Sequence, residues 1–305
     1  MKSNLLLIIS LLLLLGSLSA GCHVHLGAEA ESATISRVDS EYEIDKQVNG
    51  FIYSQPHWPQ TLRADLYLPR RHGPLPVVIA IHGGGWANRS RKDMTSISLA
   101  LAKRGYAVMN LDYRFAPRYT YPAQLDDLQQ AREWLVANAV RYQLDLDRVN
   151  AWGYSSGAHL AALLAGLEKD PALGQEQEMP RLRAVVAGGI PADLREYSNS
   201  PIVMRFMGGA LEDMPERYAD ASPLYHVSAD DPPVFLYHGK LDILVSEDQS
   251  LNYYDALKAV GVKTELYLHP LYGHMSMFLF GGDAKDRAMD FLDRNNAESL
   301  RLAGS

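Results

Sequence analysis

Cysteine is almost absent from this sequence. One cysteine in 305 residues excludes any disulfide within the chain. Long basic runs are also missing: basic residues occur in short groups such as Arg70-Arg71, and the formal net charge is −7. This gives nucleic-acid binding little electrostatic support. The composition, 47% hydrophobic and 21% charged, is typical of a globular protein, and a chain of this length buries a core without disulfides.

The one long apolar run lies at the N-terminus. Residues 5–15 are apolar apart from Ser10; Lys2 precedes them, and small residues follow at 16, 17 and 19–21. This order is typical of a secretory signal peptide, and the run is too short to span a bilayer comfortably. We therefore expect residues 1–21 to be a signal peptide, with a retained membrane anchor as the alternative.

The single cysteine, Cys22, follows Leu-Ser-Ala-Gly directly. This resembles the lipobox of bacterial lipoproteins, in which the cysteine is acylated and becomes the first residue. Ser19 departs from the aliphatic residue usual at its position. His23 is not the aspartate that retains such proteins in the inner membrane. The resemblance implies export and attachment to the outer membrane through a lipid on Cys22, with release into the periplasm as the alternative.

Small and polar residues make up most of positions 22–40, which predicts a tether. His23 and His25 are too few to predict a metal site there. From residue 41 to 305 the pattern alternates strand and helix, which predicts one α/β domain: a doubly wound, mostly parallel sheet with helices on both faces.

Three stretches of that domain carry more specific expectations. Residues 75–82 form a continuous apolar run, which predicts a strand buried on both faces. Residues 62–69 alternate apolar and polar positions, which predicts a half-buried antiparallel strand. Residues 190–231 interrupt the rhythm and are rich in Pro, Ser, Tyr and Met. We expect this segment to form helices over the sheet as a small cap-like insertion.

A nucleophile motif lies where a buried strand gives way to a helix. Gly153-Tyr154-Ser155-Ser156-Gly157 fits G-x-S-x-G, and only with Ser155 at its centre. The sharp turn of this motif lifts the central serine above the sheet edge, and it aims the next N–H, that of Ser156, at a developing oxyanion. We expect Ser155 to be the nucleophile.

A glycine run, His82-Gly83-Gly84-Gly85-Trp86, follows the strand at 75–82. Glycines let backbone N–H groups approach a substrate oxygen closely, so Gly84 and Gly85 are expected to supply the other oxyanion-hole donors. A phosphate-binding loop is the competing interpretation. The lysine and Ser/Thr of such loops do not follow, so we exclude a nucleotide site.

Taken in order, these segments resemble the α/β-hydrolase fold from about residue 45 to 295. The matching stretches are HGGGW, YAVMNLDYRFAP, YPAQLDDLQQAREWL and GYSSGAHLAAL. The resemblance is to esterases of the hormone-sensitive-lipase-like and BD-FAE branches, and also to kynurenine formamidase. Tyr154 and Ser156 depart from the GDSAGG of the hormone-sensitive-lipase branch and favour the BD-FAE side.

The resemblance also implies the remaining catalytic residues. Asp242 follows the strand PPVFLYHG at the position of the family acid, and His274, in LYGH, matches the family's terminal Gly-His; His269 is the rival base. Asp127 matches an aspartate that fixes loop structure. Trp86, Tyr154 and residues of 197–208, notably Tyr197, Met204 and Phe206, are candidates for substrate contact or for the core.

The expected activity is hydrolysis of carboxylic esters through a Ser-Asp-His triad, with no metal or cofactor. A small or polymer-linked ester is the expected partner. Amide or formamide hydrolysis uses the same triad and stays open, as does a non-catalytic binding module on the same fold.

Overall fold

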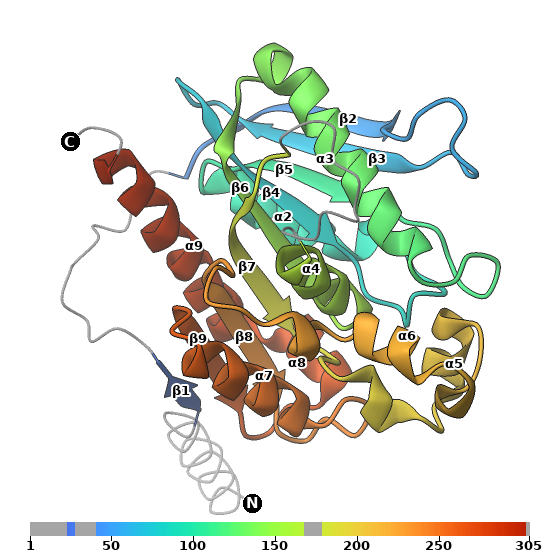
Figure 1. Cartoon of the computed structure of the whole chain (residues 1–305). Coiled ribbons are helices and arrows are strands. Elements are labelled where there is room, and N and C mark those ends of the chain that lie inside the picture. Colours follow the sequence, from blue (N-terminus) through green and yellow to red (C-terminus); the bar gives the residue numbers. More distant parts are fainter. Residues whose placement is uncertain (1–22, 28–40, 168–178, 303–305) are drawn as a thin grey trace, which may run out of the picture.

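The computed structural model describes residues 23–27, 41–167 and 179–302. The described residues form a nine-stranded sheet in the order β1-β9-β8-β7-β6-β4-β5-β3-β2 (Figure 1). Its strands are β1 (Val24–Leu26), β2 (Ile44–Ile52), β3 (Arg63–Pro69), β4 (Leu75–Ile81), β5 (Ala107–Leu111), β6 (Leu144–Tyr154), β7 (Leu182–Gly188), β8 (Val234–Gly239) and β9 (Thr264–His269).

The six strands β4 to β9 are neighbours in the sheet and run parallel. The other three, β1, β2 and β3, pair antiparallel with their neighbours. This is the α/β-hydrolase arrangement expected from the sequence. The carboxyl ends of the parallel strands share one edge of the sheet, and loops at such an edge hold the ligand sites of open α/β sheets.

Helices cover both faces of the sheet (Figure 1). One core lies between the sheet and α3 (Ala123–Tyr142), α4 (Ser156–Gly166) and α7 (Glu247–Ala259). A second core lies on the other face, against α2 (Thr95–Lys103), α8 (His274–Phe280) and α9 (Gly282–Leu302). Between β7 and β8, in the segment predicted as a cap-like insertion, the chain forms the short helices α5 (Pro201–Met207) and α6 (Pro215–Asp220).

The expectation of a tether over residues 22–40 is wrong for its first part. Val24–Leu26 is a strand, β1, that pairs antiparallel with β9. The pairing is reinforced by side chains, because His25 Nε2 lies 3.0 Å from Glu265 Oε2 and the ring of His23 stacks on Tyr267. Residues 28–40, the proposed signal peptide at 1–21 and Cys22 lie outside the described residues.

The strand predicted over 62–69 is antiparallel, as expected, but its burial differs from the prediction. β3 is buried on both faces because it lies one strand in from the edge, between β2 and β5. Asp65, one of the polar positions in that alternation, is buried: it accepts a hydrogen bond from the Gly50 N–H and pairs with Arg91. None of the helices in the described residues is both long and apolar enough to cross a membrane.

Candidate active site

Ser155 stands at the turn between β6 and α4. Its backbone dihedrals are φ 55° and ψ −122°, outside the backbone conformations that residues with a side chain prefer. Its N–H donates to the Gly188 carbonyl at 2.7 Å. Ser156 is the first residue of α4, so its N–H is one of those that a helix leaves without an internal acceptor. The turn thus presents the Ser155 side chain beside a free N–H group.

The two glycines that flank this turn are required by close packing. A Cβ on Gly153 would lie 2.1 Å from the Gly157 carbonyl oxygen. A Cβ on Gly157 would lie 2.2 Å from the carbonyl oxygen of Ile81, the last residue of β4. The first turn of α4 therefore rests directly on backbone of β4, and this contact fixes the height of Ser155 above the sheet.

The glycine loop after β4 lies against the turn. Gly84 and Gly85 have φ angles of 120° and 59°, conformations that glycine adopts without strain. The structure gives neither N–H an acceptor among the described residues. A Cβ on Gly83 would lie 2.9 Å from the Tyr154 carbonyl oxygen, so the loop packs closely on the strand end. His82 donates from Nδ1 to the Gly83 carbonyl at 2.6 Å and braces the loop.

Trp86 closes the loop and is itself held in a left-handed conformation, at φ 57°. Its indole stacks on Phe206, and its Nε1–H donates to His159 Nδ1 at 3.2 Å. The other ring nitrogen of His159 donates to the Ala221 carbonyl at 2.7 Å. Complete burial lowers the pKa of His159 to about 4, which keeps it neutral and able to accept from the indole.

Asp242 and His274 lie at the ends of the last two parallel strands. His274 Nδ1 lies 2.6 Å from Asp242 Oδ2, and both side chains are largely buried. The other carboxylate oxygen accepts the backbone N–H groups of Leu244 and Val245. Burial alone would raise the pKa of Asp242; hydrogen bonds from His238, His274 and the backbone outweigh this and hold it well below its usual range.

A second histidine approaches the same carboxylate. His238 Nε2 lies 3.3 Å from Asp242 Oδ2 and 2.9 Å from the Val245 carbonyl, while Nδ1 contacts the Ser250 hydroxyl at 2.7 Å. The Asp242 carboxylate is therefore contacted from several sides and is fixed in orientation.

Tyr154 connects the nucleophile strand to the histidine loop. Its hydroxyl donates a hydrogen bond to the backbone carbonyl of His274, and its ring packs against the His274 and Phe278 rings. Tyr154 thus lines the cavity, and it also supports His274.

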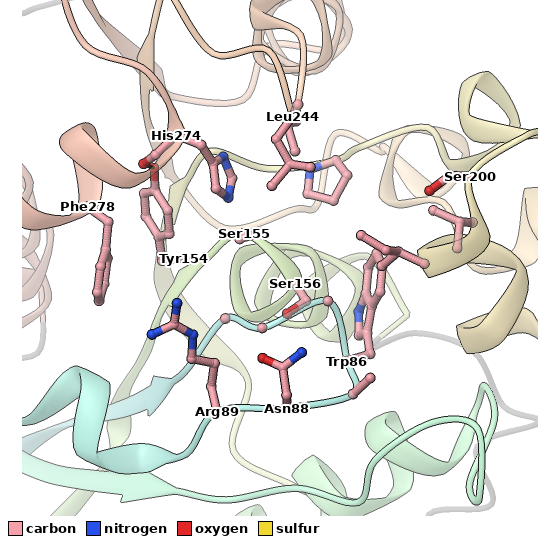
Figure 2. Close-up of a pocket in the computed structure, with 18 of the residues that line it drawn as sticks. Trp86, Asn88, Arg89, Tyr154, Ser155, Ser156, Ser200, Leu244, His274 and Phe278 are labelled. Atoms are coloured by element: carbon pink, nitrogen blue, oxygen red, sulfur yellow. Dashed lines mark hydrogen bonds between the residues drawn. The ribbon is translucent and has the colours of Figure 1, made fainter.

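A cavity of about 250 Å³ brings these groups together (Figure 2). Ser155, Ser156 and His274 line it, as do Tyr154 and Trp86. Its apolar walls come from α5, α8 and the loop after β8: Ile202, Val203, Leu244, Val245, Met275 and Phe278. The segment after the glycine run adds the polar side chains of Asn88 and Arg89.

The other candidates for substrate contact, from residues 197–208, differ in their position relative to the cavity. Tyr197 lines the cavity, whereas Phe206 is buried behind Trp86 and Met204 is not among the lining residues. Asp127 fixes loop structure as predicted: it accepts hydrogen bonds from Trp58 and from the side chain and backbone of Arg114.

A contact of Tyr113 at the site is not predicted by any local pattern in the sequence. The Tyr113 hydroxyl lies 3.0 Å from the His82 carbonyl and 3.3 Å from Ser156 Oγ, so it joins the glycine loop to the turn. Its position after β5 gave no local signal. In the parts of the chain that the structure describes, no group of three or more His, Cys, Asp or Glu side chains could hold a metal ion.

Comparisons with known proteins agree with this fold. The BD-FAE family matches residues 64–257. The esterase LipQ of Mycobacterium tuberculosis is 33% identical over 67% of this chain and 50% of its own length. An isoprenylcysteine alpha-carbonyl methylesterase of Arabidopsis thaliana is 29% identical over 71% of this chain and 54% of its own length. This chain therefore spans about half the length of these relatives.

Solved structures show the same fold. A truncated carbohydrate esterase from gut microbiota superposes with a TM-score of 0.76 at 24% identity, over 85% of this chain and 98% of that one. Esterase B from Lactobacillus rhamnosis, inhibited by a tributyrin phosphonate, gives a TM-score of 0.74 at 24% identity, over 85% of this chain and 88% of that one.

Proposed function

Because this chain belongs to the BD-FAE family, we propose that it is a serine hydrolase that cleaves carboxylic esters through Ser155, His274 and Asp242. The observation that carries the proposal is one cavity lined by a serine at a strained strand–helix turn and by a histidine bonded to a buried carboxylate. The curated relatives named above are esterases, which supports the same chemistry.

In the first half of the reaction, Ser155 Oγ attacks the acyl carbon and His274 Nε2 takes its proton. Asp242, bonded to Nδ1, fixes the tautomer that leaves Nε2 free to accept, and it stabilises the imidazolium that forms. The C–O bond to the alcohol then breaks, and the proton passes from His274 to the leaving oxygen.

The tetrahedral intermediate carries a negative oxygen next to Ser155. The N–H groups of Gly84, Gly85 and Ser156 are the proposed donors to it, and each such donor typically contributes about 3 kcal/mol to transition-state stabilisation. They are fixed before substrate arrives: the glycine loop is braced by His82, and Ser156 by the packing of α4 on β4.

In the second half, water replaces the alcohol and His274 activates it against the acyl-enzyme. Release of the acid returns Ser155 to its starting state. The reaction needs only these side chains, backbone N–H groups and water.

Hydrolysis of p-nitrophenyl esters of rising chain length, together with feruloyl and acetyl-sugar esters, tests this function. We expect the protein to hydrolyse at least the short esters, and Ser155→Ala to lower kcat by about 10⁴-fold or more. Equal activity of the two proteins would contradict the proposal.

For location, we propose export with a lipid on Cys22, on the basis of the N-terminal sequence. Mass spectrometry of the mature N-terminal peptide tests this. A first residue other than acylated Cys22 contradicts the lipid attachment.

A further inference from the structure

Large apolar side chains gather at the carboxyl edge of the sheet. They lie in two segments: residues 240–246, after β8, and residues 270–281, after β9. We call their exposed members the apolar rim: Leu241, Ile243, Leu244, Leu271, Met275, Leu279 and Phe280. Leu271 is 73% exposed and Phe280 68% exposed, so these side chains pack against little of their own protein.

Charge is nearly absent from the same two segments. Lys240 is their only exposed charged residue, because Asp242 is buried and residues 270–281 contain no Asp, Glu, Lys or Arg. Soluble monomers seldom expose so many large apolar side chains in two neighbouring segments without a use for them.

The apolar rim borders the cavity that holds Ser155. Leu244 and Met275 belong both to the rim and to the cavity lining, and Phe278 lines the cavity from the same helix, α8 (Figure 2). A molecule resting on the rim therefore lies at the entrance to the proposed active site.

The N-terminal part of the chain enters the fold at this same edge. In the antiparallel pairing of β1 with β9, Val24 lies opposite Leu268, the second-last residue of β9. Leu271 follows three residues later. Cys22 is two residues before Val24 in the sequence, which limits its distance from that residue to about 7 Å.

We propose that the apolar rim rests on the membrane to which the N-terminus attaches, with the entrance of the cavity turned towards the bilayer. The attachment, by a lipid on Cys22 or by the apolar run at 5–15, would be held beside β9 because β1 is paired there. A long tether between Cys22 and the fold would leave the domain free to turn, whereas only His23 separates Cys22 from the first residue of β1.

The substrate class that follows rests on the proposed esterase function: the membrane face narrows it to esters with an apolar part that partitions into the bilayer. Exposed apolar side chains enter the boundary between headgroups and acyl chains, where such esters lie. A substrate can then pass from the bilayer, across Met275 and Leu244, to Ser155.

The test places a fluorophore on the rim of the full-length protein in vesicles of phosphatidylethanolamine and phosphatidylglycerol. Leu279→Cys carries an NBD group on the rim. Val140→Cys is the matched control, because Val140 is 95% exposed and lies away from the rim. It is near the end of α3 and next to Leu144, the first residue of β6, at the amino edge of the sheet. The unsubstituted chain, treated in parallel, gives the background from Cys22.

We expect a nitroxide lipid to quench the label at position 279 at least about twofold more than the label at position 140. Equal quenching, or recovery of the protein outside the membrane fraction, overturns the proposal. Shielding of position 279 that needs no vesicles and grows with protein concentration also overturns it, because it assigns the rim to a second copy of the chain.

An activity measurement on Leu279→Glu and Val140→Glu separates this inference from the proposed function. We expect Leu279→Glu to hydrolyse soluble p-nitrophenyl acetate normally and a palmitoyl ester in vesicles about fivefold more slowly, with Val140→Glu unchanged on both. Hydrolysis of both esters at unchanged rates by Leu279→Glu contradicts the membrane face and leaves the esterase intact. If neither the wild type nor either variant hydrolyses an ester, but the label at position 279 is quenched, the proposed esterase function is wrong and the membrane face stands.

Discussion

The hydroxyl of Tyr154 donates a hydrogen bond to the backbone carbonyl of His274, 120 residues further along the chain. Tyr154 is the last residue of β6 and precedes Ser155 directly. The strand that delivers the proposed nucleophile therefore also holds the loop that delivers the proposed base. The alignment of these two groups depends on a contact outside the triad itself.

Tyr154→Phe keeps the ring and removes this hydrogen bond. Because a buried hydrogen bond contributes about 1 kcal/mol, we expect kcat to fall about fivefold with little change in KM. Steady-state kinetics on a short ester measure this. Tyr119→Phe, which removes a hydroxyl bonded to the Pro59 carbonyl, is the control and should leave kcat unchanged. A change confined to KM would assign Tyr154 to substrate binding instead.

Ser156→Ala separates the two neighbouring serines. Only the backbone N–H of Ser156 has a proposed catalytic part, and its hydroxyl lies 3.3 Å from Tyr113. The loss of that contact should lower kcat/KM by less than about fivefold. A loss comparable to that of Ser155→Ala in the same assay would show that the Ser156 side chain itself takes part.

Gly157→Ala tests the packing that fixes the height of the turn. The added Cβ would meet the Ile81 carbonyl oxygen at 2.2 Å, so α4 must move off β4. We expect the free energy of unfolding to fall by about 3 kcal/mol. Urea unfolding measures this, with Gly282→Ala as the control, because a Cβ at position 282 meets nothing within 4 Å. Equal stability of the two variants would show that the turn tolerates a side chain.

The stability of the fold should depend on pH through His159. Its folded pKa is about 4, below the usual value of 6.5. As pH falls from 6.5 towards 4, the unfolded chain binds a proton that the folded chain does not, so stability is lost over this range, by up to about 3 kcal/mol.

His159→Gln lacks this titration. The difference in unfolding free energy between the wild type and His159→Gln should therefore narrow as pH falls from 7 to 4.5, as measured by urea unfolding at each pH. A difference that stays constant would show that His159 titrates normally in the folded protein.

The sequence predicted the turn and the glycine loop well because their geometry is encoded locally. Gly153 and Gly157 tolerate no Cβ, and Gly84 and Gly85 adopt positive φ, so the required residue types appear at fixed spacing. The alternation of strands and helices predicted the parallel sheet for the same reason.

The sequence did not predict features that depend on partners far away along the chain. The three residues of β1 are too few for their alternation to predict a strand, and their structure depends on pairing with β9. The half-buried pattern over 62–69 did not predict the burial of Asp65, because its partners, Gly50 and Arg91, come from other segments of the chain. The contact of Tyr154 with the His274 carbonyl likewise exists only in the folded chain.

The central claim is that Ser155 is a nucleophile activated by His274, and covalent labelling tests it most directly. The full-length protein is treated with a fluorophosphonate, digested, and the adduct located by mass spectrometry. We predict one phosphonyl group on the peptide containing Ser155, and no adduct with Ser155→Ala, whereas Ser156→Ala is labelled like the wild type. An unlabelled wild type, or equal labelling of Ser155→Ala, would contradict the account.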